Sequence, residues 1–277
     1  MASFRLVRTV SWYYFRNYYR SKSFYLMLSV VILVSALMTY FTFRYENNLS
    51  TILPRADMAS FSPGLKEDVF GYLWAFVLLD LPVFAAVFFG SPAISSEIES
   101  RTAYQIFPLP VGRSKLLLSK YLAAVAVTSL CILIYVLVQA SVFLYLFHSL
   151  GISFFQSSAL LVLFIFTVTA FTFMISGIFN RNTYAYITVF LIYFLVFNAY
   201  EIIVEFLYRT TPYYLLNVSA DIIDRVYFNI IPDPFSTSFT LSPAGTSVIL
   251  QSVSVMVSYL IVSLSAALII FERKEVK

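Results

Sequence analysis

Six long apolar stretches constrain this chain more than any other feature of its sequence. A helix that crosses a bilayer needs about 20 mostly apolar residues. The chain is 60% hydrophobic and 12% charged, whereas a soluble domain carries about 25% charged residues. We therefore predict an all-α integral membrane protein, one domain over residues 1–277, with spans at Ser23–Phe43, Val69–Gly90, Leu116–Phe147, Phe155–Phe179, Tyr184–Leu207 and Ser247–Phe271.

The rest of the composition argues against most kinds of catalytic site. With one cysteine, Cys131, and one histidine, His148, the chain cannot form an internal disulfide, and it lacks the ligands of a typical zinc site. No G-x-x-x-x-G-K-[ST] sequence occurs, and only 7 glycines are present in all, so a phosphate-binding loop is absent. We expect no catalytic residue, no metal site and no nucleic-acid partner. If ATP drives this protein, another chain hydrolyses it.

The distribution of Lys and Arg predicts the orientation in the cell membrane. Thirteen of these residues lie in the N-terminal arm, in the Ser95–Lys120 segment, at Arg181 or in the C-terminal tail, and five lie in the opposite loops. Cytoplasmic segments of membrane proteins are enriched in Lys and Arg. We therefore expect both termini, Ser95–Lys120 and the Arg181 turn in the cytoplasm.

The N-terminal arm, residues 3–21, is too polar to span a membrane. On a helical wheel its arginines fall within an arc of roughly 120°, and its apolar residues face the other way. This pattern predicts an elbow helix that lies in the interface and contacts membrane lipid. A basic flank that only sets the topology is the alternative. The basic side of this helix carries Arg5, Arg8, Arg16 and Arg20, and the apolar side carries Phe4, Val7, Val10, Tyr14 and Tyr18.

A polar segment, Ser95–Lys120, separates the second and third spans. Its Ser96-Glu-Ile-Glu99 sequence is a capping box, which predicts a short helix beginning at Glu97. Pro108 and Pro110 should end this helix, because proline lacks a backbone donor and disfavours helix in the preceding residue. After Gly112, the next helix should begin near Arg113.

The segment also carries a longer spacing pattern. It reads E-x-E-x-x-T, with Pro eight residues further on, Arg three after that and Lys seven after that, at Glu97, Glu99, Thr102, Pro110, Arg113 and Lys120. At these positions the segment resembles the permease subunits of type 2 ABC exporters. The resemblance implies a cytoplasmic coupling helix over Glu97–Arg113, in the loop 95–113, which docks on a separate ATP-binding subunit. It also implies ATP and Mg²⁺ on that subunit and a second permease copy, identical or not, in a dimer.

Arg101 departs from the family pattern, which usually has glycine before the threonine. It could signify a continuous helix or a contact specific to the partner. Two alternatives stay open at this point. The segment could be a charged linker that only fixes topology, and the protein could be a membrane anchor or assembly factor that transports nothing.

Three polar residues within the apolar stretches are candidates for a translocation path. Asp80 lies about midway along the second span, two residues before Pro82, and a carboxylate at that depth costs roughly 3 kcal/mol or more. The alternative interpretation of Asp80 is a protonated side chain that bonds to a neighbouring helix. Gln139 could instead only form hydrogen bonds between helices, and Glu201 could simply lie near the outer interface.

The long external segment, residues 208–246, is too apolar for a free loop. Val218, Ile222, Val226 and Ile230 recur every four residues, and Asp221 and Arg225 are spaced as an i,i+4 pair. We expect one or two short amphipathic or re-entrant helices, closed by Pro232, Pro234 and Pro243. Asp221 and Asp224 also form a D-x-x-D pair, as in membrane enzymes that bind Mg²⁺-diphosphate, but a second acidic motif is absent.

Overall fold

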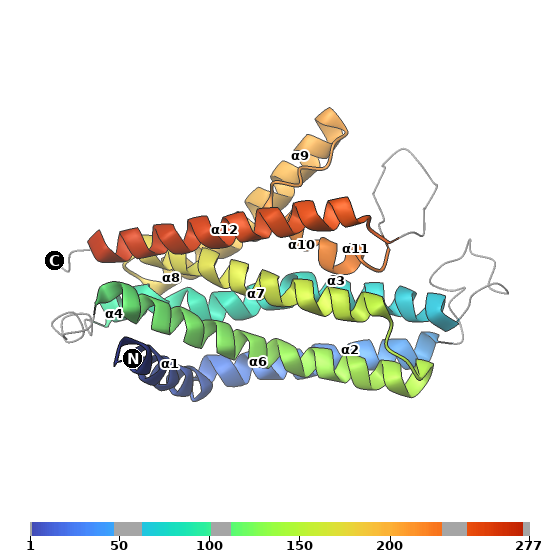
Figure 1. Cartoon of the computed structure of the whole chain (residues 1–277), viewed down its shortest axis with the longest axis horizontal. Coiled ribbons are helices and arrows are strands. Elements are labelled where there is room, and N and C mark those ends of the chain that lie inside the picture. The colour runs from blue at the N-terminus through green and yellow to red at the C-terminus, as the bar shows by residue number, and fades with distance from the viewer. Residues whose placement is uncertain (1, 47–62, 101–111, 229–242, 274–277) are drawn as a thin grey trace.

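The chain folds into long helices that run side by side (Figure 1). The computed structural model describes residues 2–46, 63–100, 112–228 and 243–273. Within those ranges all regular structure is helical, and six helical stretches are long and apolar enough to cross a membrane. The predicted all-α membrane fold with six spans is therefore confirmed.

Three helices form the centre of the bundle. They are α3 (Pro63–Gly90), α6 (Arg113–Phe147) and α7 (Ile152–Ile178), and each packs against the other two. Their core is rich in rings, among them Trp74, which donates from Nε1 to Thr42 Oγ1 at 2.9 Å, and Tyr135, which donates to the Trp74 carbonyl at 3.1 Å. Buried polar atoms at this depth need such partners, because no water is present to replace them.

The other long helices surround this centre. Helix α1 (Ala2–Tyr19) and α2 (Lys22–Tyr45) pack on α6, while α12 (Thr246–Arg273) packs on α7. Much of the apolar surface of α2 and α12 is exposed, which suits helices that face acyl chains or another membrane protein. Both ends of the chain lie at the same end of the bundle (Figure 1).

The second span is longer than predicted and continues into the polar segment. After Gly90 and a turn at Ser91, α4 (Pro92–Glu99) begins with proline at its first position, where its missing N–H costs nothing. The prediction that a helix begins at Glu97 is wrong, because α4 ends at Glu99. The capping-box signal misleads because the Glu99 carboxylate accepts a hydrogen bond from the distant amide of Asn182 instead of a local amide.

The remainder of the polar segment divides into two parts. Residues 101–111, which include Arg101, Thr102, Pro108 and Pro110, lie outside the described residues, and with them most of the predicted coupling helix. After Gly112, α6 begins at Arg113, as the sequence predicts.

The fifth span is a helix of two kinds rather than the single helix expected. An α-helical part, α8 (Asn182–Phe190), leads into a π-helix, η3 (Leu191–Phe197), and then into α9 (Asn198–Tyr208). Figure 1 shows α9 projecting away from the long helices. π-helical turns inside α-helices are rare and often occur at functional sites.

Short helices cover the far end of the bundle. They are α10 (Leu216–Ala220) and α11 (Ile222–Arg225), which pack on α12, α3 and α7. The ion pair expected between Asp221 and Arg225 is present at 3.0 Å. Because Asp224 and Arg225 are buried together with Val218 and Ile222, the segment has no single polar face. Ile230, Pro232 and Pro234 lie outside the described residues.

Candidate functional site

Five helices meet at the end of the bundle where the chain starts and finishes. They are α1, α4, α6, α8 and α12, and both the end of α4 and the start of α6 lie here. Polar side chains link these helices to one another and to the end of α7. We call this group the end cluster: Tyr14, Ser95, Glu97, Glu99, Arg113, Ser114, Lys120, Ser176, Asn182 and Glu272.

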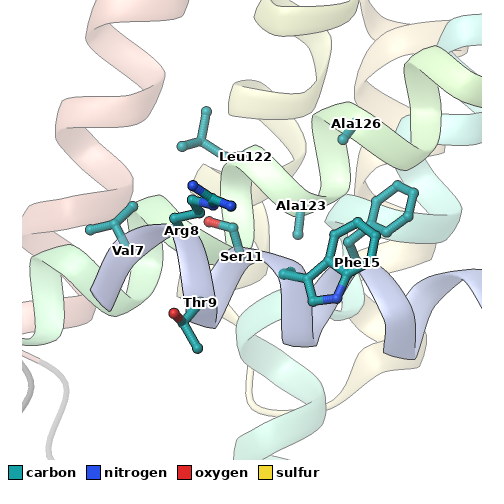
Figure 2. Close-up of a pocket in the computed structure, with 9 residues that line it drawn as sticks. Val7, Arg8, Thr9, Ser11, Phe15, Leu122, Ala123 and Ala126 are labelled. Carbon is teal, nitrogen blue, oxygen red and sulfur yellow. The ribbon is translucent and has the colours of Figure 1, made fainter. Parts of the chain in front are cut away.

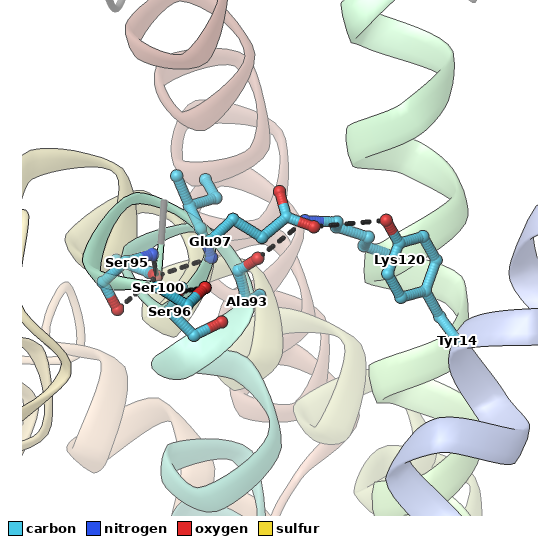
Figure 3. Close-up of polar contacts among 9 residues, drawn as sticks. Tyr14, Ala93, Ser95, Ser96, Glu97, Ser100 and Lys120 are labelled. Carbon is cyan, nitrogen blue, oxygen red and sulfur yellow. Dashed lines mark hydrogen bonds and ion pairs between the residues drawn. The ribbon is translucent and has the colours of Figure 1, made fainter. Parts of the chain in front are cut away.

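A buried ion pair between Glu97 and Lys120 forms the centre of the end cluster (Figure 3). The side chain of Lys120 is 1% exposed, and its Nζ pairs with Glu97 Oε1 and donates to the Ala93 carbonyl at 2.9 Å. The Tyr14 hydroxyl donates to the same carboxylate oxygen at 3.2 Å, and Lys120 Nζ lies 5.1 Å from the centroid of the Tyr14 ring. The group therefore joins α1, α4 and α6.

The surroundings explain how these charges stay buried. A buried ion is strongly unfavourable unless partners and hydrogen bonds compensate for lost water, and Lys120 has a carboxylate, a carbonyl and an aromatic ring. Burial raises the pKa of Tyr14 well above its usual value, and the nearby Glu97 carboxylate raises it further. Tyr14 therefore remains protonated and continues to donate its hydrogen bond.

A second part of the end cluster connects α4 to α7 and α8. The backbone amides of Ile94 and Ser95 both donate to Ser176 Oγ, at 3.1 and 3.2 Å, and Ser95 Oγ lies 2.6 Å from Asn182 Oδ1. The amide of Asn182, the first residue of α8, donates to Glu99 Oε2 at 3.0 Å. A carboxylate at this position also interacts favourably with the positive end of the α8 dipole.

A third part connects the start of α6 to the end of α12. Arg113 Nη1 donates to the Glu272 carbonyl at 2.9 Å, and Ser114 Oγ donates to the Glu272 carboxylate. Lys and Arg side chains often bond the free carbonyls of a helix end in this way. The residue that begins α6 is thus held by the last turn of α12.

The residues singled out from the sequence therefore divide into two groups. Glu97 and Lys120 are buried and paired with each other, while Glu99 and Arg113 lie nearer the surface. Sequence reasoning missed the partners on other helices, Tyr14, Ser176, Asn182 and Glu272. Only Tyr14 gave a signal, since it stood on the apolar side of the predicted elbow helix, although that side was expected to face lipid.

Asp80, Gln139 and Glu201, the candidates for a translocation path, lie on three different helices, α3, α6 and α9. Asp80 is exposed on α3, beside a groove of about 400 Å³ between α2 and α3, and within the described ranges it has no hydrogen bond or ion pair. Glu201 accepts a hydrogen bond from Asn217 Nδ2 at 2.5 Å, which ties α9 to α10. Gln139 is buried on α6 near Tyr227.

The two aspartates of the D-x-x-D pair do not converge on a metal site in this structure. Asp221 is bonded to Arg225, and burial raises the pKa of Asp224 to about 7. Among the residues that the structure describes, no group of three or more His, Cys, Asp and Glu side chains could hold a metal ion.

Comparison with known proteins identifies the family. No curated protein matches the chain significantly. The model of the ABC-2 family transporter proteins matches residues 8–276, almost the whole length. This match covers the six spans and every residue of the end cluster. The chain therefore belongs to the ABC-2 transporter permease family, whose members are the membrane subunits of ABC transporters.

Proposed function

We propose that this chain is the transmembrane subunit of an ATP-binding-cassette exporter, in which residues 1–277 form one permease domain. It works with a separate ATPase subunit that docks on the loop 95–113, and with a second permease copy across the translocation path. ATP and Mg²⁺ bind to the ATPase subunit, and this chain supplies no catalytic residue. The observation that carries the proposal is the end cluster, which connects five helices around the two ends of that loop.

The contacts explain how movement of the loop would reach the membrane. A force on α4 passes to α6 and α1 through Glu97, Lys120 and Tyr14, and to α8 through Glu99. A force on the start of α6 passes to α12 through Arg113. Because packed helices shift as rigid elements, closure of the ATPase subunits would tilt several spans together.

The proposal also assigns the orientation and the accessory helices. Both termini and the end cluster are cytoplasmic, in line with the distribution of Lys and Arg. Helix α1 is the interfacial elbow, and α10 and α11 are the re-entrant helices at the outer surface. Asp80 faces the path or the second permease copy, because a carboxylate at this depth is strongly unfavourable against lipid, and Glu201 lies toward the outer end of the path.

Purification from native membranes tests the docking assignment. We expect the solubilised chain to co-purify with an ABC ATPase subunit, and reconstitution of both to give ATP hydrolysis that depends on this chain. Arg101→Glu should reduce recovery of the ATPase, because it reverses a charge in the loop. Arg44→Glu, at the opposite end of the bundle, is the matched control.

The outcomes separate the proposal from its alternatives. Equal ATPase recovery with Arg101→Glu and wild type would show that Arg101 takes no part in docking. A complete absence of ABC ATPase from the purified sample would overturn the proposal as a whole. An ATPase that binds without driving transport of any tested amphiphile would favour the membrane anchor.

A further inference from the structure

A cavity lies between α1 and α6. Its volume is about 760 Å³, and it is lined by Val7, Arg8, Thr9, Ser11, Trp12, Phe15, Leu122, Ala123 and Ala126. Pockets that bind small molecules usually measure about 300–1,000 Å³. Figure 2 shows Arg8, Ser11 and Phe15 of α1 on the side that faces Leu122, Ala123 and Ala126 of α6. We call it the α1–α6 cavity.

The position of the cavity along α6 sets its depth in the membrane. Helix α6 has 35 residues, whereas the hydrocarbon layer needs about 20, so several residues at each end reach the headgroup region. Leu122 is the tenth residue of α6 and Ala126 the fourteenth. The α6 wall therefore stands at the boundary of the hydrocarbon layer, where a phospholipid has its phosphate and the first part of its acyl chains.

The wall formed by α1 is polar where a headgroup would lie. Arg8, Ser11, Trp12 and Phe15 are spaced along one side of the helix, and the rings of Trp12 and Phe15 are stacked with centroids 5.5 Å apart. The Ser11 Oγ atom is buried and has no hydrogen-bond partner in the part of the chain that the structure describes. Within the same part, Arg8 forms no ion pair.

These features indicate the charge of the ligand. A guanidinium group binds a phosphate through two parallel hydrogen bonds, and a serine hydroxyl can donate a third. Leu122, Ala126 and Phe15 offer only apolar surface, which suits an acyl chain. A soluble phosphate would leave this surface in contact with water, whereas a phospholipid covers both parts.

We propose that the α1–α6 cavity binds one anionic phospholipid, with its phosphate on Arg8 and Ser11 and an acyl chain along Ala126 and Phe15. The lipid would hold α1 against α6 and so support the Tyr14 contact of the end cluster. This inference uses the interfacial position of α1 proposed above, but it does not depend on transport or on the ATPase.

Trp12 provides a direct probe, because the chain has only two tryptophans. The other, Trp74, is buried in the core, and Trp74→Phe leaves Trp12 as the only indole. The full chain is reconstituted in two sets of phosphatidylcholine vesicles. One set contains a small fraction of phosphatidylglycerol with brominated acyl chains, and the other contains the same fraction of phosphatidylcholine with brominated acyl chains. We expect the brominated phosphatidylglycerol to quench Trp12 fluorescence several-fold more strongly than the brominated phosphatidylcholine.

Three variants connect this preference to the cavity. Arg8→Gln should bring the ratio of the two quenching efficiencies close to one. Arg16→Gln, which changes an arginine of α1 outside the cavity, should preserve the ratio. Ala126→Leu should fill the space beside Trp12 and reduce quenching by both lipids. If Trp74→Phe does not fold, the fluorescence of Trp12→Phe, which comes from Trp74 alone, is subtracted from the fluorescence of the wild type. The difference is the Trp12 fluorescence.

Each contrary result has a definite meaning. Equal quenching by both lipids in the parent chain would overturn the proposed site while leaving α1 in the interface. Loss of the preference with Arg16→Gln as well as Arg8→Gln would show diffuse attraction by a basic helix instead of a site. Quenching by neither lipid would remove α1 from the membrane and overturn the inference together with the elbow assignment.

Discussion

At the scale of single residues, Lys120 is a charged side chain whose partners lie within the chain. Its charge and its place beside a polar segment suggest a contact with another protein, yet its side chain is 1% exposed and is paired with Glu97. Two of the matching residues thus act within the chain, where they hold the helices that flank the loop 95–113. We therefore expect contact with the ATPase subunit to depend on residues nearer the surface.

Removing one member of this pair should destabilise the protein strongly. We expect Lys120→Met to reduce the free energy of unfolding by about 3–5 kcal/mol, because it leaves the Glu97 carboxylate buried without its cation. The double variant Glu97→Gln/Lys120→Met should regain most of this loss, since neither charge remains. Cys131 is buried, so a thiol-reactive dye that fluoresces when it labels Cys131 reports unfolding on heating in detergent.

The matched control for this experiment is Lys115→Met, which removes an exposed charge on the same helix. Its unfolding temperature should remain close to that of the wild type. If Lys120→Met were as stable as Lys115→Met, the ion pair would contribute nothing to the fold, and its role in joining α1, α4 and α6 would be wrong.

At the scale of elements, the close packing of α3 against Tyr227 depends on one glycine. A Cβ atom built on Gly71 would lie 2.3 Å from Cε1 of Tyr227, far inside contact distance, whereas one built on Gly64 of the same helix would meet nothing within 4 Å. The two glycines therefore form a natural pair for comparison. One is needed for packing and the other is not.

We expect Gly71→Ala to destabilise the protein by about 1–3 kcal/mol, the usual cost of overpacking a core. Gly64→Ala should be neutral or slightly stabilising, because alanine favours helix over glycine by about 1 kcal/mol. Gly71→Ala/Tyr227→Leu should regain part of the loss. Unfolding temperatures, and protease cleavage of the segment that contains Tyr227, measure these effects. Equal stability of Gly71→Ala and Gly64→Ala would contradict the packing of Gly71 against Tyr227.

Comparison of elements also shows what the sequence could predict. Hydropathy places α2, α6, α7 and α12 within a few residues of their observed ends, since burial in lipid depends mainly on local composition. It could not place the end of α4, because Glu99, the carboxylate of the capping box, has its partner Asn182 on another helix. Nor could it detect η3, since π-helical turns have no reliable residue pattern, and the side-chain partners of the end cluster depend on tertiary packing alone.

At the scale of the whole molecule, the structure brings its two ends and the end cluster to one side. Glu201 and Asn217 lie at the other side, where α10 and α11 cover the bundle. The central helices α3, α6 and α7 connect the two sides. An arrangement of this kind can relay a movement across the membrane while its core remains packed.

The orientation can be tested with cysteines introduced in a Cys131→Ala background. We expect a membrane-impermeant maleimide to label Arg44→Cys and Tyr208→Cys on intact cells, because these positions lie at the predicted outer side. Lys115→Cys and Arg16→Cys should react only after the membrane is opened, since the positive-inside rule places them in the cytoplasm. Labelling of the second pair on intact cells would reverse the topology.

The π-helix in the fifth span gives this layout a mechanical consequence. If η3 returned to α-helical geometry, the register would change by one residue, which turns everything beyond it by about 100° around the helix axis. At one end of this span the Asn182 amide donates to Glu99 of α4. Toward the other end, Glu201 accepts a hydrogen bond from Asn217 of α10. A pull on α8 could therefore rotate α9 about its axis, which would present a different set of side chains at the α9 end of the span.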